Sequence, residues 1–312
     1  MSTIDLSTPS PAPRSLLGSL PRRVALTLPE LQEVARRAGD APLPFDLAES
    51  APADALESRL GESRACVEDE AYATALAALH DPVDSLTRRG LISSDGTLEE
   101  GLAGAVGLLA TPQVALDLDL GVQGESLRQV KAWHRQSGDA VASLATGDGL
   151  VFELAWFPTT AWPAELARVA VLPEDHSKRA SQVPPVVDLP FELADAAVEA
   201  GSHGRSDLLQ VLISRHEGDV LDGEGRPLPQ AEVPGVLDAL GRESRGRLRA
   251  LVADVSRSTT TVVGVRSWVL LADGWRTLHS HHGGEPARVE IRSITAAELA
   301  VDLAPVLAEV TS

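Results

Sequence analysis

The sequence is poor in the residues that form covalent cross-links and cysteine-based metal sites. Of its 312 residues only one, Cys66, is a cysteine. The chain can therefore form no disulfide bond within itself and no zinc site built from several cysteines. A single cysteine is typical of proteins that work in a reducing compartment, so we expect a cytoplasmic protein.

Aromatic residues and positive charges are also scarce. Aromatic side chains make up 3% of the chain and hydrophobic residues 44%, so the core must consist mostly of Leu, Val and Ala, which favour helices and strands together. The net charge is −18, and Lys and Arg form no sustained run. Because nucleic acids are bound through cations that displace counterions from phosphates, we expect no nucleic-acid partner.

Long apolar runs are missing as well. No run approaches the roughly 20 residues that a bilayer-spanning helix needs. Residues 1–21 are rich in Ser, Thr and Pro and lack the order of a secretory signal, in which a charged region precedes an apolar one. We expect these residues to be a disordered tail and the protein to have no membrane contact.

The first part of the chain carries helical patterns. Thr27, followed by Pro29 in the first turn and by Glu30 three residues on, predicts the capped start of a helix. The helical spacing of apolar residues predicts further helices over 70–89 and 98–109.

Strand patterns follow these helices. The stretch 114–120 alternates between apolar and other residues, which predicts a half-buried strand with Asp117 and Asp119 on its solvent side. Glycosidases use a pair of carboxylates that flank the substrate in a cleft. Asp117 and Asp119 form such a pair by type, but nothing in the sequence indicates a cleft around them. The stretches 126–139 and 140–156 continue as strands with short links, which must be antiparallel.

Two hairpins share a turn sequence. Residues 140–156 (AVASLATGDGLVFELAW) and 266–280 (RSWVLLADGWRTLHS) each place an Asp–Gly pair, at Asp148 and Asp273, between two strand-like runs. Each is followed by a helical run that contains Ala-Glu-Leu-Ala. We interpret both aspartates as turn formers, selected with their glycines for backbone geometry. The repetition predicts two related halves.

The predicted fold class is α+β, with a central antiparallel sheet flanked by helices. We expect the first half to span 22–172, the second half to span 189–312, and the proline-containing segment 173–188 to be a linker. Both halves would form one compact domain.

Motifs for catalysis or ion binding are weak. The chain contains no phosphate-binding loop, no dinucleotide-binding fingerprint and no Gly-x-Ser-x-Gly nucleophile elbow. The acidic turn 218–225 does not begin with the Asp-x-Asp-x-Asp-Gly pattern of a calcium loop. His279, His281 and His282 are the best metal candidates, but no patterned third ligand completes a catalytic site. We predict a protein without enzymatic activity or cofactor, and leave metal binding by these histidines open.

Several stretches together resemble the EspG proteins, which are associated with ESX (type VII) secretion in actinobacteria. Their order and spacing carry the resemblance, and the abundance of Ala and the excess of Arg over Lys fit an actinobacterium of high GC content. The stretches are LTLPELQEVARRAGDAPLPFDL (26–47), LTRRGLISSDGTLEEGLAGAVGLLATPQVALDLDL (86–120), RQVKAWHRQSGDAVASLATGDGLVFELAW (128–156), DGWRTLHS (273–280) and ITAAELAVDLAPVL (294–307).

The resemblance implies two pseudo-symmetric halves around the sheet and a chaperone role. Members of the family are cytosolic and bind the exposed hydrophobic tip of the PPE subunit in PE–PPE pairs before secretion. This sequence departs from the pattern in two places. The run 262–269 (VVGVRSWV) stands where a Gly-Arg-Tyr-like run often occurs, and the turn 136–139 is short where some relatives carry a longer loop that contacts the client. A WxG-type substrate is therefore an alternative client.

The expected partner-binding segment surrounds that short turn. Aromatic side chains commonly anchor interfaces, so Trp133 is the proposed anchor, although aromatic residues more often pack in the core, which is the alternative for this one. The oligomeric state does not follow from the sequence. The expected contact residues are Trp133, Arg135, Gln136, Ser137, Gly138 and Asp139.

Other function classes remain as alternatives. A ligand-binding or regulatory domain would use Trp156, Trp162 and Trp268 to line a pocket. A winged-helix-like regulator would use Arg88 and Arg89 to contact phosphate. The same stretch, however, ends in two acidic residues, Glu99 and Glu100, which would repel phosphate. A hydrolase with an unrecognised site is a further alternative.

Overall fold

The computed structural model describes residues 22–45, 81–123, 127–171, 178–203, 209–257, 259–281 and 287–310. The chain divides into two compact units, which interleave along the sequence: Met1–Gln113 with His134–Ala161, and Val114–Trp133 with Trp162–Ser312. The division of the chain into halves at 22–172 and 189–312 stays a prediction, and the expected tail over 1–21 lies outside the described residues.

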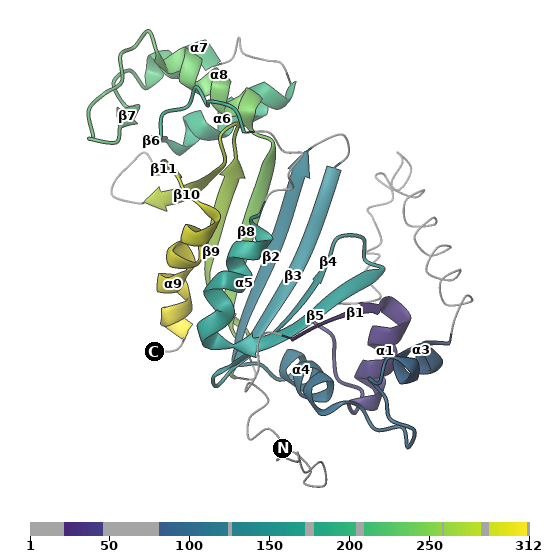
Figure 1. The fold of residues 1–312 in the computed structure, drawn as a ribbon. Helices are drawn as coiled ribbons and strands as arrows, with labels where there is room; N and C mark the ends of the chain where they lie inside the picture. The colour runs from purple at the N-terminus through teal and green to yellow at the C-terminus, as the bar shows by residue number, and fades with distance from the viewer. Residues whose placement is uncertain are drawn as a thin grey trace, which may run out of the picture. The chain divides into compact units, whose positions relative to one another are not determined.

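The first unit contains helices packed on antiparallel strands (Figure 1). Its described elements are β1 (Arg22–Thr27), α1 (Leu28–Arg37), α3 (Pro82–Arg88), α4 (Glu100–Ala110), β4 (Ala140–Thr146), β5 (Val151–Pro158) and the 3-10 helix η1 (Thr159–Ala161), together with the end of β3 (Leu127–Ser137).

The second unit contains most of the strands. Its described elements are β2 (Val114–Gln123), the start of β3, α5 (Trp162–Val169), β6 (Val186–Pro190), α6 (Phe191–His203), α7 (Leu209–Arg215), β7 (Leu221–Asp222), α8 (Val233–Glu243), β8 (Gly246–Asp254), β9 (Thr261–Leu270), β10 (Trp275–His281), β11 (Arg288–Ser293), η3 (Ala296–Glu298) and α9 (Leu299–Val310).

The strands form an antiparallel sheet in the hydrogen-bonding order β1-β5-β4-β3-β2-β8-β9-β10-β11-β6-β7. The predicted α+β class, with a large antiparallel sheet flanked by helices, is confirmed. β1 pairs with β5, the last strand before α5, and β6 pairs with β11, the last strand before α9. The pseudo-symmetry of two halves in space stays a prediction.

The start of α1 follows the predicted capping chemistry. The Thr27 hydroxyl accepts the Glu30 N–H at 3.4 Å, and the Glu30 carboxylate accepts the Thr27 N–H at 2.9 Å. This reciprocal box satisfies two backbone donors that a helix start would otherwise leave without partners. The strand β1 before it, which carries two arginines and buries Leu26, was not predicted from the sequence.

A second strand lies partly inside the segment expected to be a linker. Residues 186–188 of that segment open β6, which pairs with β11 and buries Val187 and Leu189. The neighbouring prolines at positions 184 and 185 concealed this short alternating pattern. The helix α6 begins directly after this strand, at Phe191.

Helices cover the strands of the second unit closely. Figure 1 shows α5 and α9 side by side, and α9 also packs on β8 and β9. A methyl group on Gly264 of β9 would lie 2.8 Å from Cγ1 of Val306 in α9, so this glycine permits the close approach. The second unit also contains a hydrophobic core in which the strands β6 and β11 pack against the helices α6, α7 and α8.

No helix in the described part of the chain is long and apolar enough to span a membrane.

Candidate partner-binding surface

The predicted contact segment comprises the end of β3 and the turn before β4. Arg135 and Gln136 are each only 8% exposed. Gly138 and Asp139 are exposed, and Trp133 is half-buried. A partner can therefore reach the turn itself, whereas Arg135 and Gln136 lie below the surface.

Hydrogen bonds fix the shape of this turn. The Gly138 N–H donates to Oε1 of Gln113 at 3.2 Å, and Nε2 of Gln136 donates to the Gly138 carbonyl at 2.5 Å. Gly138 has a φ of 57°, a conformation that other residues rarely adopt, and it follows the half-buried Ser137. Gln136 thus positions the turn from beneath and presents Gly138 and Asp139 to solvent.

The hairpin between β4 and β5 ends in a loop that Asp148 organises. Its Oδ1 accepts the N–H groups of Leu150 at 2.9 Å and Val151 at 3.0 Å, and the Thr146 hydroxyl at 3.3 Å. Partial burial acts to raise the pKa of Asp148, but these hydrogen bonds outweigh it and hold the pKa below its usual range. The geometry agrees with the interpretation of Asp148 as a turn former.

The second Asp–Gly turn, between β9 and β10, has an additional contact. Oδ2 of Asp273 accepts from Nη2 of Arg276 at 2.9 Å, and Arg276 is only 1% exposed. The same guanidinium donates to the carbonyl oxygens of Pro184 at 2.5 Å and Val183 at 3.1 Å. Asp273 therefore helps a buried arginine attach β10 to the segment before β6.

The tryptophans of the ligand-binding alternative are core residues. Trp156 is 5%, Trp162 8% and Trp268 0% exposed. In the first unit the Arg22 guanidinium lies 5.0 Å from the ring centroid of Trp156, at the range of a cation–π contact. These side chains fill the interior of their own units, and none of the contacts points to a ligand.

The arginine proposed as part of a phosphate clamp has partners within the protein. Nη1 of Arg89 lies 3.2 Å from Oε2 of Glu30, and its Nη2 donates to the Ala25 carbonyl at 2.6 Å. Arg89 thus joins α3 to α1 and β1 inside the first unit. This arrangement gives no support to a winged-helix-like regulator.

The acidic turn 218–225 contains a counter-charge for its own carboxylates. Asp222 accepts the N–H groups of Glu224 and Arg226, and the Arg226 guanidinium pairs with both carboxylates. These backbone contacts lower the pKa of Asp222. The carboxylates of the turn are therefore already paired with an arginine of the same turn. Asp119 is exposed and Asp117 half-buried along β2, in the predicted alternation.

His279 and His281 are two residues apart in β10 and so lie on one face of the strand, and His282 lies outside the described residues. Nε2 of His281 lies 3.3 Å from Oδ1 of Asp188, a carboxylate that also binds Arg288. Among the residues that the structure describes, no three His, Cys, Asp or Glu side chains are placed to hold a metal ion.

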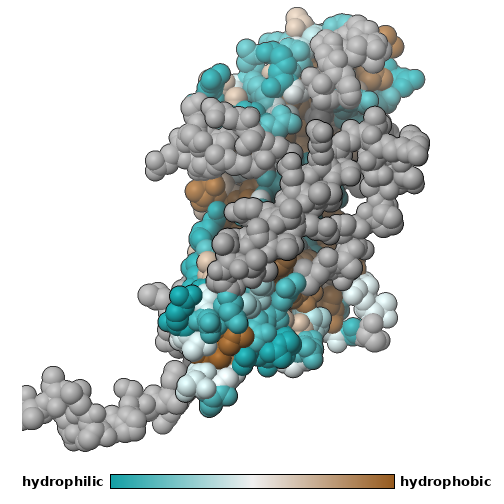
Figure 2. All heavy atoms as spheres, turned by 90° about the vertical axis from the view of Figure 1, so that its right-hand side faces the viewer, coloured by the Kyte–Doolittle hydropathy of each residue, from teal (hydrophilic) through white to brown (hydrophobic). Residues whose placement is uncertain are grey.

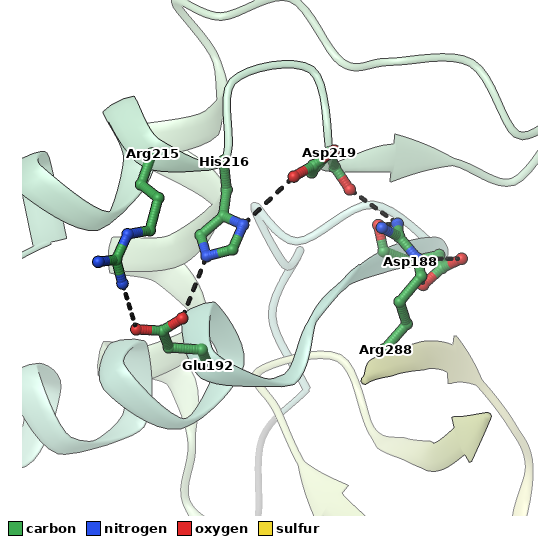
Figure 3. Close-up of polar contacts among 6 residues, drawn as sticks. All are labelled: Asp188, Glu192, Arg215, His216, Asp219 and Arg288. Atoms are coloured by element: carbon green, nitrogen blue, oxygen red, sulfur yellow. Dashed lines mark hydrogen bonds and ion pairs between the residues drawn. The ribbon is translucent and has the colours of Figure 1, made fainter. Parts of the chain in front are cut away.

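Sequence reasoning missed a polar cluster in the second unit, shown in Figure 3. It links the start of α6, the end of α7, the turn before β7, and the strands β6 and β11. A histidine followed by acidic residues in RHEGD (215–219) was the available signal, but its second partner, Glu192, lies 24 residues away in sequence. The six residues are Asp188, Glu192, Arg215, His216, Asp219 and Arg288.

Exposed apolar side chains are distributed over several elements. On the coloured part of the face in Figure 2, apolar groups are separated by hydrophilic ones. Leu251 and Val265 are direct cross-strand partners on β8 and β9. Within the described ranges, the exposed large apolar residues are Val151, Val171, Phe191, Val211, Leu251, Val262, Val265 and Val301.

Comparison with known proteins gives a likeness in fold. No protein-family model and no curated protein matches the chain. Among solved structures the chain is similar to the type VII secretion system chaperone EspG5 of Mycobacterium tuberculosis, determined in complex with a PE25–PPE41 dimer. The TM-score is 0.54 at 11% sequence identity, over 92% of this chain and 96% of that one. The chain therefore has an EspG-like fold.

Proposed function

We propose that this protein is a non-enzymatic chaperone of type VII secretion in an actinobacterial cytoplasm. Its client would be a pair of helical proteins of the PE/PPE kind, with a WxG-type substrate as the alternative. The protein would bind the client before export and keep it soluble.

One observation carries the proposal. The likeness to EspG5 extends over 92% of this chain and 96% of that chain, and EspG5 was solved with a PE25–PPE41 dimer bound. Because the likeness covers nearly the whole of both chains, it is not limited to one widespread supersecondary motif. Function is not fixed by fold alone, so the client class is the part that experiment must decide.

The physical role would be to cover apolar surface. Exposed apolar patches on helical pairs promote aggregation, and a bound chaperone removes them from water. We propose that the contact segment includes Trp133, Arg135, Gln136, Ser137, Gly138 and Asp139. Within it the exposed turn Gly138–Asp139 would touch the client, while Arg135 and Gln136 would support it from below.

Co-expression tests the proposed function. A PE/PPE-type pair from the same genome is produced in a heterologous host with and without this protein, and the soluble fraction of the pair is measured after centrifugation. We expect the soluble fraction to rise several-fold and the pair to co-purify with the tagged protein. An unchanged soluble fraction and no co-purification, with the protein itself folded, would refute the chaperone role.

A charge reversal tests the contact segment separately. Asp139→Arg places a positive charge on the exposed turn and should weaken binding of the pair by about tenfold or more. The matched control is Glu309→Arg, the same kind of reversal at an exposed position near the end of α9. Equal affinities for both variants would move the contact away from the turn without affecting the chaperone proposal.

A further inference from the structure

His216 lies between two carboxylates in the second unit. Its Nδ1 is 3.2 Å from Oδ2 of Asp219, and its Nε2 is 3.2 Å from Oε2 of Glu192 (Figure 3). The side chain of His216 is 9% exposed, whereas the side chains of Glu192 and Asp219 are about half exposed, at 49% and 45%. The ring is thus the buried centre of a contact whose acidic sides face water.

The two contacts require a particular protonation state. An ionised carboxylate can only accept hydrogen bonds, and a neutral imidazole carries one donor and one acceptor nitrogen. A neutral ring can therefore satisfy only one of the two carboxylates, and its other nitrogen would turn a lone pair toward a negatively charged oxygen. Only the protonated ring, in which both nitrogens donate, satisfies Glu192 and Asp219 together.

The surrounding charges balance with the protonated ring. Arg215 of α7 binds the second oxygen of Glu192 at 3.2 Å, and Arg288 of β11 donates to the Asp219 carbonyl at 2.7 Å and pairs with Asp188 of β6. With His216 protonated, the six residues of Figure 3 carry three positive and three negative charges. Loss of the ring proton leaves the cluster with one uncompensated negative charge.

We propose that His216 is a pH-sensitive clip that fastens the end of α7 and the turn before β7 to the first turn of α6. The clip is closed when the ring is protonated, because both carboxylates are then bound. When the ring loses one of its two protons, only one of the two contacts can remain. The end of α7 then loosens from α6.

The position of His216 explains why the effect is local. Its N–H donates to the Leu212 carbonyl at 3.1 Å, and its own carbonyl accepts the Asp219 N–H at 3.1 Å, so it joins the last turn of α7 to the following turn. Carbonyl groups at a helix end favour a positive charge nearby. The contacts of Arg288 hold the turn to β11 at any pH, so the clip controls α7 and leaves the strands in place.

His281 of β10 provides an internal contrast. His281 contacts the carboxylate of Asp188 through Nε2 at 3.3 Å. A neutral ring can make that contact as a donor. The element around His281 should therefore keep its contacts when the pH rises, whereas the element around His216 should not.

Amide hydrogen exchange on the full-length protein tests the clip. Protection factors, corrected for the intrinsic pH dependence of exchange, are compared at pH 5.5 and pH 8.0. We expect protection of the α7 amides and of residues 216–219 to fall by about tenfold between the two, while α9 changes little. Nitrogen-15 shifts of the His216 ring report the loss of its second proton, and the fall in protection should follow that loss.

Glu192→Gln separates the clip from a general pH effect. A glutamine amide can donate to a neutral imidazole and still accept from Arg215, so this variant should keep α7 protected at pH 8.0. His279→Gln, which replaces an exposed histidine of β10, should behave as the unmodified protein does. Unchanged protection of α7 across the pH range in the unmodified protein, or an equal fall in Glu192→Gln, would overturn the proposal.

Discussion

The two Asp–Gly turns look alike in sequence and differ in structure. Asp148 accepts two backbone N–H groups and a hydroxyl of its own hairpin loop. Asp273 instead binds Arg276, a guanidinium with 1% exposure that also holds two carbonyl groups of a distant segment. One aspartate shapes a local loop, and the other belongs to a long-range buried contact.

The turns also occupy different places in the order of strands. The Asp148 loop joins β4 to β5, the last two strands before α5, whereas the Asp273 turn joins β9 to β10 and is followed by β11 before α9. The second hairpin is thus followed by one strand more than the first before the closing helix. Asp–Gly recurs in both turns because its chemistry suits tight turns.

Removing the buried arginine should have the largest effect. Arg276→Met keeps an apolar side chain of similar length but leaves the carbonyls of Val183 and Pro184 and the Asp273 carboxylate without their donor. We expect the free energy of unfolding to fall by about 3 kcal/mol, as a lower urea midpoint followed by circular dichroism. Arg292→Met is the matched control, since Arg292 pairs with Glu290 at an exposed position. It should cost less than about 1 kcal/mol, and equal midpoints for both variants would contradict the account.

Replacing each of the two turn aspartates should lower the free energy of unfolding by different amounts. Asp273→Ala leaves a buried guanidinium without its carboxylate, and we expect a loss of about 2 kcal/mol in the free energy of unfolding. Asp148→Ala removes an acceptor whose partners water can reach, and we expect a loss of about 1 kcal/mol. Urea titrations of both variants check this order, and a larger loss for Asp148→Ala would reverse the comparison.

Acid should affect the Asp148 loop in a small but definite way. Hydrogen bonds hold the pKa of Asp148 below its unfolded value, despite partial burial, so its ionised form stabilises the folded state. That contribution is complete above about pH 4 and is lost as the pH falls below it. The difference in unfolding free energy between the protein and Asp148→Asn should therefore shrink between about pH 4 and pH 2.5. A difference that stays constant in acid would show that the carboxylate's charge contributes nothing.

Local patterns predicted those elements whose stabilising partners are near in sequence. The capping box of Thr27 and Glu30 needs only four consecutive residues, and the alternation in β2 needs only one strand. The strand β1 was missed because it is short, begins with two arginines and gains its stability by pairing with β5, more than a hundred residues later. The sequence of β1 contains no pattern that identifies β5 as its pairing partner.

The polar contacts were beyond sequence reasoning for the same reason. Arg276 binds a carbonyl 92 residues away, and Arg288 binds a carboxylate 100 residues away. Periodicity marks which positions are apolar and cannot show which distant charges meet. In the predicted contact segment, likewise, the sequence named the turn, but only the structure separates the exposed Asp139 from the buried Arg135 and Gln136.

The most direct test of the central claim is the mass of the complex in solution. The purified protein and a purified PE/PPE-type pair from the same genome are mixed and analysed by size-exclusion chromatography with multi-angle light scattering. The account predicts one stable species that contains the protein and both members of the pair. Separate elution of the folded protein and a soluble, intact pair at micromolar concentrations would contradict it.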